Sequence, residues 1–133
     1  MEKYAKLFTK AALGYLLLGV FLGVAVGINP ALSSKLRFVH IHLNLLGFMV
    51  MMIAGVAYHV LPRFNARPVP WPEGVKYHLI LQNVGLLGMV STYMGGGLWS
   101  EGVLHALFIA FAVIAAVSLG IMVYNLGGVL APL

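Results

Sequence analysis

Cysteine is absent from this chain of 133 residues, and aspartate is absent as well. Without thiols the chain can form no disulfides, iron–sulfur clusters, thiolate zinc sites or c-type heme attachments. Charge is scarce too, because only 8% of the residues are charged, whereas a soluble domain carries about 25%. These shortages exclude an ordinary soluble domain and indicate an integral membrane protein, with one domain over residues 1–133.

Long apolar runs take the place of the missing charge, since 62% of the residues are hydrophobic. Four runs meet the length of about 17–25 residues that a membrane-spanning helix needs. They cover approximately residues 7–28, 38–61, 77–94 and 101–126. We therefore expect an all-α fold, a bundle of four transmembrane helices. Because three more runs follow the first, we interpret the first as a span and not as a cleavable signal peptide.

Three connections are expected between these runs, over residues 29–37, 62–76 and 95–100. The middle one contains four prolines and is predicted to be an extended loop without helix. Trp71 and Tyr77 on one side of the membrane, and Trp99 on the other, are typical of interfacial anchors.

The basic residues lie near the predicted helix ends, so we attribute the net charge of +5 to lipid head groups and topology. Membrane lipid is thus the expected partner, and no nucleic acid is. Six basic residues fall on the side of the termini: Lys3, Lys6, Lys10, Arg63, Arg67 and Lys76. The other side has Lys35 and Arg37. This asymmetry predicts a multi-pass protein of the cell inner membrane with its N- and C-termini in the cytoplasm.

The second run carries polar side chains that need partners. No Lys, Arg, Asp or Glu occurs between Arg37 and Arg63, a stretch that spans ~38 Å as a helix at ~1.5 Å per residue. It nevertheless contains His40, His42 and Asn44. Polar groups at membrane depth are costly unless they are paired, so these residues form the candidate site.

His40 and His42 are two positions apart, so on a helix they point roughly 200° apart, at about 100° per residue. They cannot bind one metal ion or one flat cofactor together from a single helix. The face below His40 is small and partly polar: Asn44, Gly47, Met51, Ala54, Gly55 and Tyr58. The face below His42 is apolar: Leu46, Met49, Ile53, Val56 and Val60. One helix therefore presents an imidazole to each of two neighbours, and imidazole is a good ligand for iron, copper or zinc. A flat apolar macrocycle also suits apolar walls with glycines that allow close approach, so we expect Gly47 to leave room for a cofactor.

The order of residues in this run resembles that of a known family. His-x-His is followed by Leu-Gly-Phe at 46–48 and by Met-x-x-x-Gly-x-x-Tyr-x-x-x-Pro-Arg at 51–63. This pattern resembles one helix of the catalytic subunit of the heme–copper oxidase superfamily, and within it the cbb-type oxidases and nitric oxide reductases. The resemblance covers residues 37–64. It implies that His40 binds a high-spin heme and His42 a low-spin heme, and that the cofactor is heme b.

The chain resembles a single four-helix unit of that larger subunit. If one chain replaces each third of the subunit, three copies form a ring, a homotrimer with heme b at the interfaces between protomers. In such a ring His42 of one chain faces His40 of the next, and a heterologous contact that closes gives a cyclic oligomer.

Two further residues lie near the predicted heme sites. His105 either supplies a ligand paired with His40 or His42, or forms a hydrogen bond to a heme propionate or to Glu101 one turn earlier. Arg37 is placed either to bind a propionate, since guanidinium groups match carboxylates, or to anchor the helix end.

At the other membrane side, His59 and His78 are expected to lie together, either as a solvated pair or as ligands of a second heme. In the first run, Gly19, Gly23 and Gly27 are spaced by four, which predicts a tight packing seam. Asn44, Gln82, Asn83 and Tyr58 are expected to form interhelical hydrogen bonds.

These features predict a heme b-binding membrane protein that transfers electrons, from a quinol or a small redox donor, or that binds nitric oxide or oxygen. They leave open whether it is an enzyme. One alternative is a cofactor-free accessory or assembly protein of a respiratory complex, since the copper-binding histidine motifs of the family are absent. Another is a copper-handling membrane protein that uses His40, His42 and the methionines, although Met49, Met51, Met52 and Met89 are more typical of gap-filling residues.

Overall fold

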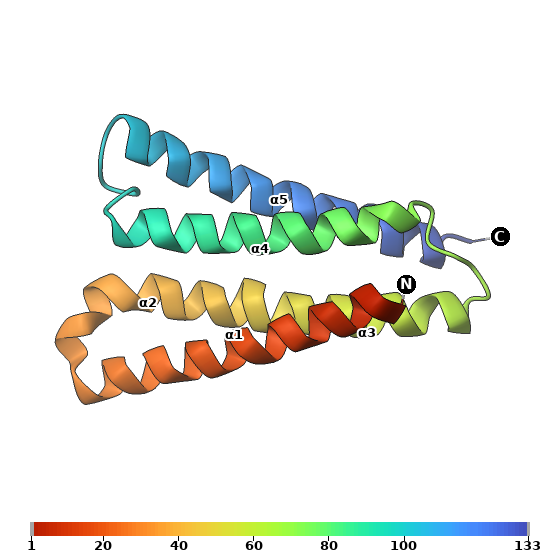
Figure 1. Ribbon diagram of the computed structural model, residues 1–133, viewed down its shortest axis with the longest axis horizontal. Helices are drawn as coiled ribbons and strands as arrows, with labels where there is room; N and C mark the ends of the chain where they lie inside the picture. Colours follow the sequence, from red (N-terminus) through yellow and green to blue (C-terminus); the bar gives the residue numbers. More distant parts are fainter. Residues whose placement is uncertain (1, 133) are drawn as a thin grey trace.

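Four helical rods make up residues 2–132, the part of the chain that the computed structural model describes (Figure 1). The first rod is α1 (Glu2–Ile28). The second is continuous and consists of η1 (Pro30–Leu32), α2 (Ser33–His42), η2 (Leu43–Met49) and α3 (Val50–Phe64). The last two are α4 (Pro72–Met94) and α5 (Val103–Leu130). Residues 2–132 contain no strand, which confirms the predicted all-α class.

The rods form two antiparallel hairpins that pack side by side, α1 with α2–η2–α3 and α4 with α5 (Figure 1). Both termini and the α3–α4 connection lie at one end of the bundle, which we call the terminal end. The α1–α2 and α4–α5 connections lie at the other end. Contacts of α1 with α4 and of α3 with α5 join the hairpins, so the core lies between them.

Three of the rods are long and apolar enough to cross a membrane. They are Lys3–Ile28, Pro30–Phe64 and Val103–Leu130. The fourth, α4, has 23 residues, but polar side chains interrupt it and several of them are buried, including His78 and Gln82. That α4 also spans a membrane therefore stays a prediction.

Two of the three connections are shorter than the sequence predicts. Residues 29–37 are mostly helical, because the Asn29 side chain accepts a hydrogen bond from the Ala31 backbone at 3.3 Å and starts a helical turn there. The loop expected over 62–76 is wrong at both ends. The helix α3 continues through Pro62, and α4 begins with Pro72, since the first turn of a helix does not need the N–H that proline lacks.

Wider helical turns in η2 are a feature that the sequence pattern does not predict. There the Val50 backbone N–H donates to the Leu45 carbonyl, five residues back, as in a π-helix. The Leu46 carbonyl thereby loses Val50 as its donor, and the Gln82 side chain of α4 donates to it at 3.0 Å. A buried amide thus compensates for the irregular backbone, as burial of polar groups requires.

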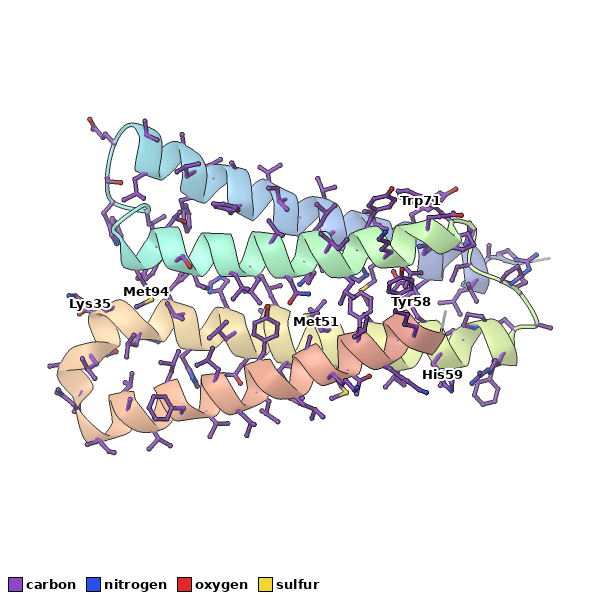
Figure 2. All side chains as sticks on the ribbon, viewed as in Figure 1. Lys35, Met51, Tyr58, His59, Trp71 and Met94 are labelled. Carbon is purple, nitrogen blue, oxygen red and sulfur yellow. The ribbon has the colours of Figure 1, made fainter. Side chains whose placement is uncertain are left out.

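The wider turns also keep one side of the second rod facing the core. Its buried residues Val39, Leu43, Gly47 and Met51 are spaced by four. On a regular α-helix of 3.6 residues per turn, each step of four would rotate this side by about 40°. Because π turns take up more residues than α turns, this rotation is reduced. Met51 and Tyr58 both lie between the two hairpins (Figure 2).

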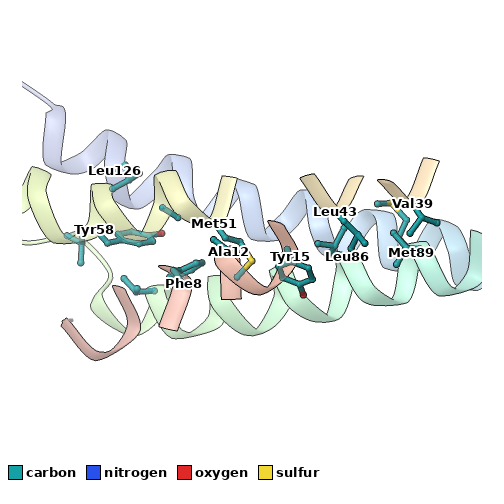
Figure 3. Close-up of a cluster of buried hydrophobic side chains, with 14 of the residues drawn as sticks. Phe8, Ala12, Tyr15, Val39, Leu43, Met51, Tyr58, Leu86, Met89 and Leu126 are labelled. Atoms are coloured by element: carbon teal, nitrogen blue, oxygen red, sulfur yellow. The ribbon is translucent and has the colours of Figure 1, made fainter. Parts of the chain in front are cut away.

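Large side chains from both hairpins fill the core (Figure 3). Phe8, Met51 and Leu86 are fully buried, and Phe8 lies against Tyr58 with ring centroids 5.7 Å apart. Polar bonds reinforce this packing, since the Tyr15 hydroxyl donates to the Asn83 side chain at 2.6 Å. The predicted interhelical hydrogen bonds of Gln82, Asn83 and Tyr58 are confirmed.

The α4–α5 hairpin depends on a glycine at its closest approach. A methyl group added at Gly85 would lie 2.6 Å from the Ala115 backbone nitrogen, so Gly85→Ala must push the two helices apart. We expect a loss of about 1–3 kcal/mol of stability, the usual cost of overpacking. Thermal unfolding in detergent, followed by circular dichroism, measures it. Gly120→Ala is the control, because nothing lies within 4 Å of that position; equal unfolding midpoints of the two variants would contradict this account.

Candidate functional site

His40 faces α1, where its imidazole fills the space beside Gly23 and meets the Gly19 carbonyl. Its Nδ1 lies 2.7 Å from the Gly19 carbonyl oxygen. A methyl group added at Gly23 would lie 2.8 Å from Cε1 of the imidazole. The Asn44 side chain donates to the His40 carbonyl at 2.8 Å and packs on Gly19, where an added methyl group would lie 2.6 Å from its Nδ2. The predicted packing seam is therefore present at Gly19 and Gly23, and it ends before Gly27, which has open space around it.

His42 faces a different neighbour, through a stack of aromatic rings. Its imidazole stacks on Phe38 with centroids 3.8 Å apart and planes at 26°. Phe38 in turn stacks on Tyr93 of α4, at 4.0 Å and 15°. Phe108 of α5 closes this cluster, 6.0 Å from Phe38. The divergence predicted from the spacing is confirmed, because His40 contacts α1 whereas His42 lies on the α4 side.

His40, His42 and His105 hold their imidazoles in the same way. The Nδ1 of each lies 2.7–2.9 Å from a backbone carbonyl oxygen. The acceptors are the carbonyl oxygens of Gly19, Phe38 and Gly97, respectively. A carbonyl oxygen can only accept, so Nδ1 must carry the proton and Nε2 has a free lone pair. Within residues 2–132, none of the three Nε2 atoms has a hydrogen-bond partner.

This arrangement is the one that proteins use to prepare a histidine for a metal. A ligating imidazole donates its other N–H to a carbonyl or carboxylate, which fixes the tautomer and orients the ring. His40 and His42 are both half-buried, so neither is sealed inside the bundle. The donor set fits an iron porphyrin, which takes neutral imidazole nitrogen as an axial ligand.

Gly47 was expected to leave room for a cofactor, but another side chain of the same chain fills the space beside it. A methyl group added at Gly47 would lie 2.6 Å from Cγ of Tyr15, so the tyrosine ring of α1 packs on this glycine. Gly47 therefore belongs to helix packing.

Arg37 is exposed near the His42 side of the rod. It lines a surface hollow with Ser33, Phe38 and Tyr93, and Phe38 is the ring on which His42 stacks. Within the described chain, its guanidinium has no ion pair or hydrogen bond. An anionic group at this hollow can therefore meet a free cation.

His105 is near the same end of the bundle, but it does not pair with Glu101. Its Nδ1 donates to the Gly97 carbonyl at 2.9 Å. Glu101 is exposed and precedes α5, which begins at Val103, so the expected pair one helical turn apart does not form. No hydrogen bond joins His105 to His40 or His42 in residues 2–132.

His59 and His78 have separate surroundings, and the predicted solvated pair is wrong. His78 is fully buried, with Nδ1 3.0 Å from the Tyr58 hydroxyl, and Nε2 has no partner. His59 contacts Arg63 of its own helix and lies on the side of α3 away from α4 (Figure 2). Tyr58 of α3 and Phe8 of α1 contact His78 in the core, a placement that its nearness to the loop did not indicate. Among the described residues, no group of three His, Cys, Asp or Glu could hold a metal ion.

The hydroxyl of Tyr58 supplies the hydrogen bond of a buried imidazole. We expect Tyr58→Phe to lose about 1–3 kcal/mol of stability, since His78 would be left buried without a partner. Thermal unfolding in detergent measures the loss. Tyr124→Phe is the control, because Tyr124 is 60% exposed; a Tyr58→Phe protein as stable as this control would show that the bond contributes nothing.

Comparison with known proteins adds no relative to this picture. No family model, curated protein or solved structure matches the chain. Function is therefore inferred from the side-chain geometry and from the residue pattern at 37–64.

Proposed function

We propose that this chain is a heme b-binding membrane protein in which His40 and His42 are axial ligands of heme iron through Nε2. One observation carries the proposal. Each imidazole has its Nδ1 proton fixed on a backbone carbonyl while its Nε2 has no partner within the described residues. In an apolar helix a bare nitrogen lone pair is costly, so an unpaired Nε2 indicates a ligand from outside the chain. The resemblance of residues 37–64 to the heme–copper oxidase superfamily supports the same cofactor.

The neighbours of the two histidines suit this role. Gly19 and Gly23 let α1 approach His40 closely enough for its Nδ1–H to reach a carbonyl. Phe38 holds the plane of His42 by stacking on it. Arg37 is the chain's donor for a heme propionate, since a guanidinium forms paired hydrogen bonds with a carboxylate. When bound, the heme supplies a one-electron redox centre.

Because the two imidazoles lie on different sides of one rod, they cannot ligate the same iron within one protomer. We therefore place each heme between protomers, with His42 of one protomer opposite the partner's His40. A contact of this kind is heterologous, and it closes into a ring. The exposed apolar residues Ile41, Leu45 and Met49, beside the histidines, would be covered in the ring. Three copies, a homotrimer, is the number that the resemblance favours.

We propose that the protein lies in a bacterial-type inner membrane and that α4 is its fourth span. Both termini lie at one end of the bundle, where six of the eight Lys and Arg residues are found, so the positive-inside rule assigns that end to the cytoplasm. His40 and His42 then lie toward the outer side. With both axial positions filled by histidine, the function is electron transfer, and a quinol or a small redox protein is the donor.

The absorption spectrum tests the ligands. Protein made with added heme should show a Soret band, and His40→Ala and His42→Ala should each lower heme affinity at least about 10–100-fold, the loss that removal of a mere supporting partner causes. His59→Ala is the matched control, because among the described residues that imidazole has a hydrogen bond only to Arg63 of its own helix.

Carbon monoxide adds a second reading of the same samples. It should leave the reduced wild-type spectrum unchanged, because no axial position is open. A colourless wild-type protein, or a control that loses as much heme as the ligand variants, would refute heme binding at this site and favour an accessory protein.

The mass of the intact complex tests the ring. Native mass spectrometry should find three chains with bound heme. His42→Ala should lose the heme and dissociate into monomers, since the heme joins the protomers. Arg67→Ala serves as the comparison, because Arg67 reaches the Ala131 carbonyl at the opposite end of the bundle. A heme-loaded monomer would contradict ligation between protomers while leaving heme binding intact.

A further inference from the structure

A groove runs between α1 and α3 near the terminal end of the bundle. Its floor forms where the two helices come closest: a methyl group added at Gly55 would lie 2.6 Å from the Thr9 hydroxyl and 2.9 Å from the Ala5 carbonyl oxygen. Val56 and Val60 form one wall and separate the groove from a second, wholly apolar hollow on the outer side of α3. Two apolar troughs therefore lie side by side along one ridge.

Basic side chains line this double trough. Lys6 and Lys10 line the groove from α1, and His59 lines it from α3. His59 also contacts Arg63, and these two residues line a third hollow that joins the groove at Val60. No carboxylate lines any of the three hollows in the described chain.

Lys10 lies well inside an apolar span. It is about 10 Å along the span that starts at Lys3, at ~1.5 Å per residue. It is exposed and has no hydrogen bond or ion pair among residues 2–132. An ammonium at this depth extends its stem toward the head groups, which brings it toward His59 and Arg63.

We propose that this surface binds one anionic diacyl phospholipid. Its two acyl chains lie in the troughs on either side of the Val56–Val60 ridge, and its phosphate lies between Lys10 and the His59–Arg63 pair. The apolar troughs match two hydrocarbon chains, and the cations match a phosphodiester, which guanidinium groups bind by paired hydrogen bonds. Free phosphate would satisfy the cations but leave both troughs uncovered, so we commit to the lipid.

Lipid retention by the full chain tests the proposal. The protein in detergent is given equal amounts of dioleoyl phosphatidylglycerol and dioleoyl phosphatidylcholine, and native mass spectrometry counts the lipid that stays bound. We expect about thirtyfold preference for the anionic lipid, as two basic side chains supply at a membrane surface. Lys10→Gln with Arg63→Gln should abolish this preference. Lys35→Gln, an exposed lysine at the other end of the bundle, should retain it.

A second variant tests the troughs separately from the charge. Val60→Phe keeps every cation and fills the space on both sides of the ridge, so it should lower retention of phosphatidylglycerol without a change in unfolding midpoint. Equal retention of the two lipids by wild type, or an equal loss in Lys35→Gln, would overturn the proposal. Displacement of the bound lipid by inorganic phosphate alone would overturn it as well, because it would show that the troughs play no part.

Discussion

Every polar atom that the chain places among apolar helices needs a partner, and this constraint determines how the bundle is built. His40 can lie against α1 because Gly23 leaves room for the imidazole, while Gly19 leaves room for Asn44 and offers its carbonyl to His40. Where α1 has no glycine, the second rod supplies one instead, as Gly47 does for Tyr15. The same glycines thus allow the first hairpin to pack closely and His40 to take its orientation.

The second hairpin meets the same constraint with side-chain bonds. Gln82 donates to the Leu46 carbonyl that the wide turns leave free, and it accepts from the Ser118 hydroxyl of α5. A single amide therefore joins the second rod, α4 and α5. The polar side chains of α4 thus have a role in packing, because Gln82, His78 and Asn83 bond to groups on neighbouring helices. Such bonds contribute modestly in a membrane, yet a missing partner is costly.

Much of this arrangement is predictable from the sequence, because it follows from local spacing. The two-residue step between His40 and His42 gives their divergence, and the four-residue step of Gly19 and Gly23 gives the seam. The wide turns of η2 are not predictable in this way, since a constant 100° per residue assumes a regular helix. The burial of His78 also escapes local rules, because it depends on the distant Tyr58 and Phe8. The prolines led to a predicted loop over 62–76, but Pro72 lies in the first turn of α4, where a missing N–H has no consequence.

The wide turns of η2 lie directly between the histidines and the lower half of the same rod. Since a π turn takes up more residues than an α turn, the residue count of this segment and the width of its turns together determine the direction in which the imidazoles leave the bundle relative to Tyr58 below. A regular α-helix with the same number of residues would turn both rings away from their present neighbours while every contact below Val50 stayed in place. The direction of the candidate ligands thus depends on the number of residues in this segment as much as on the identity of the side chains.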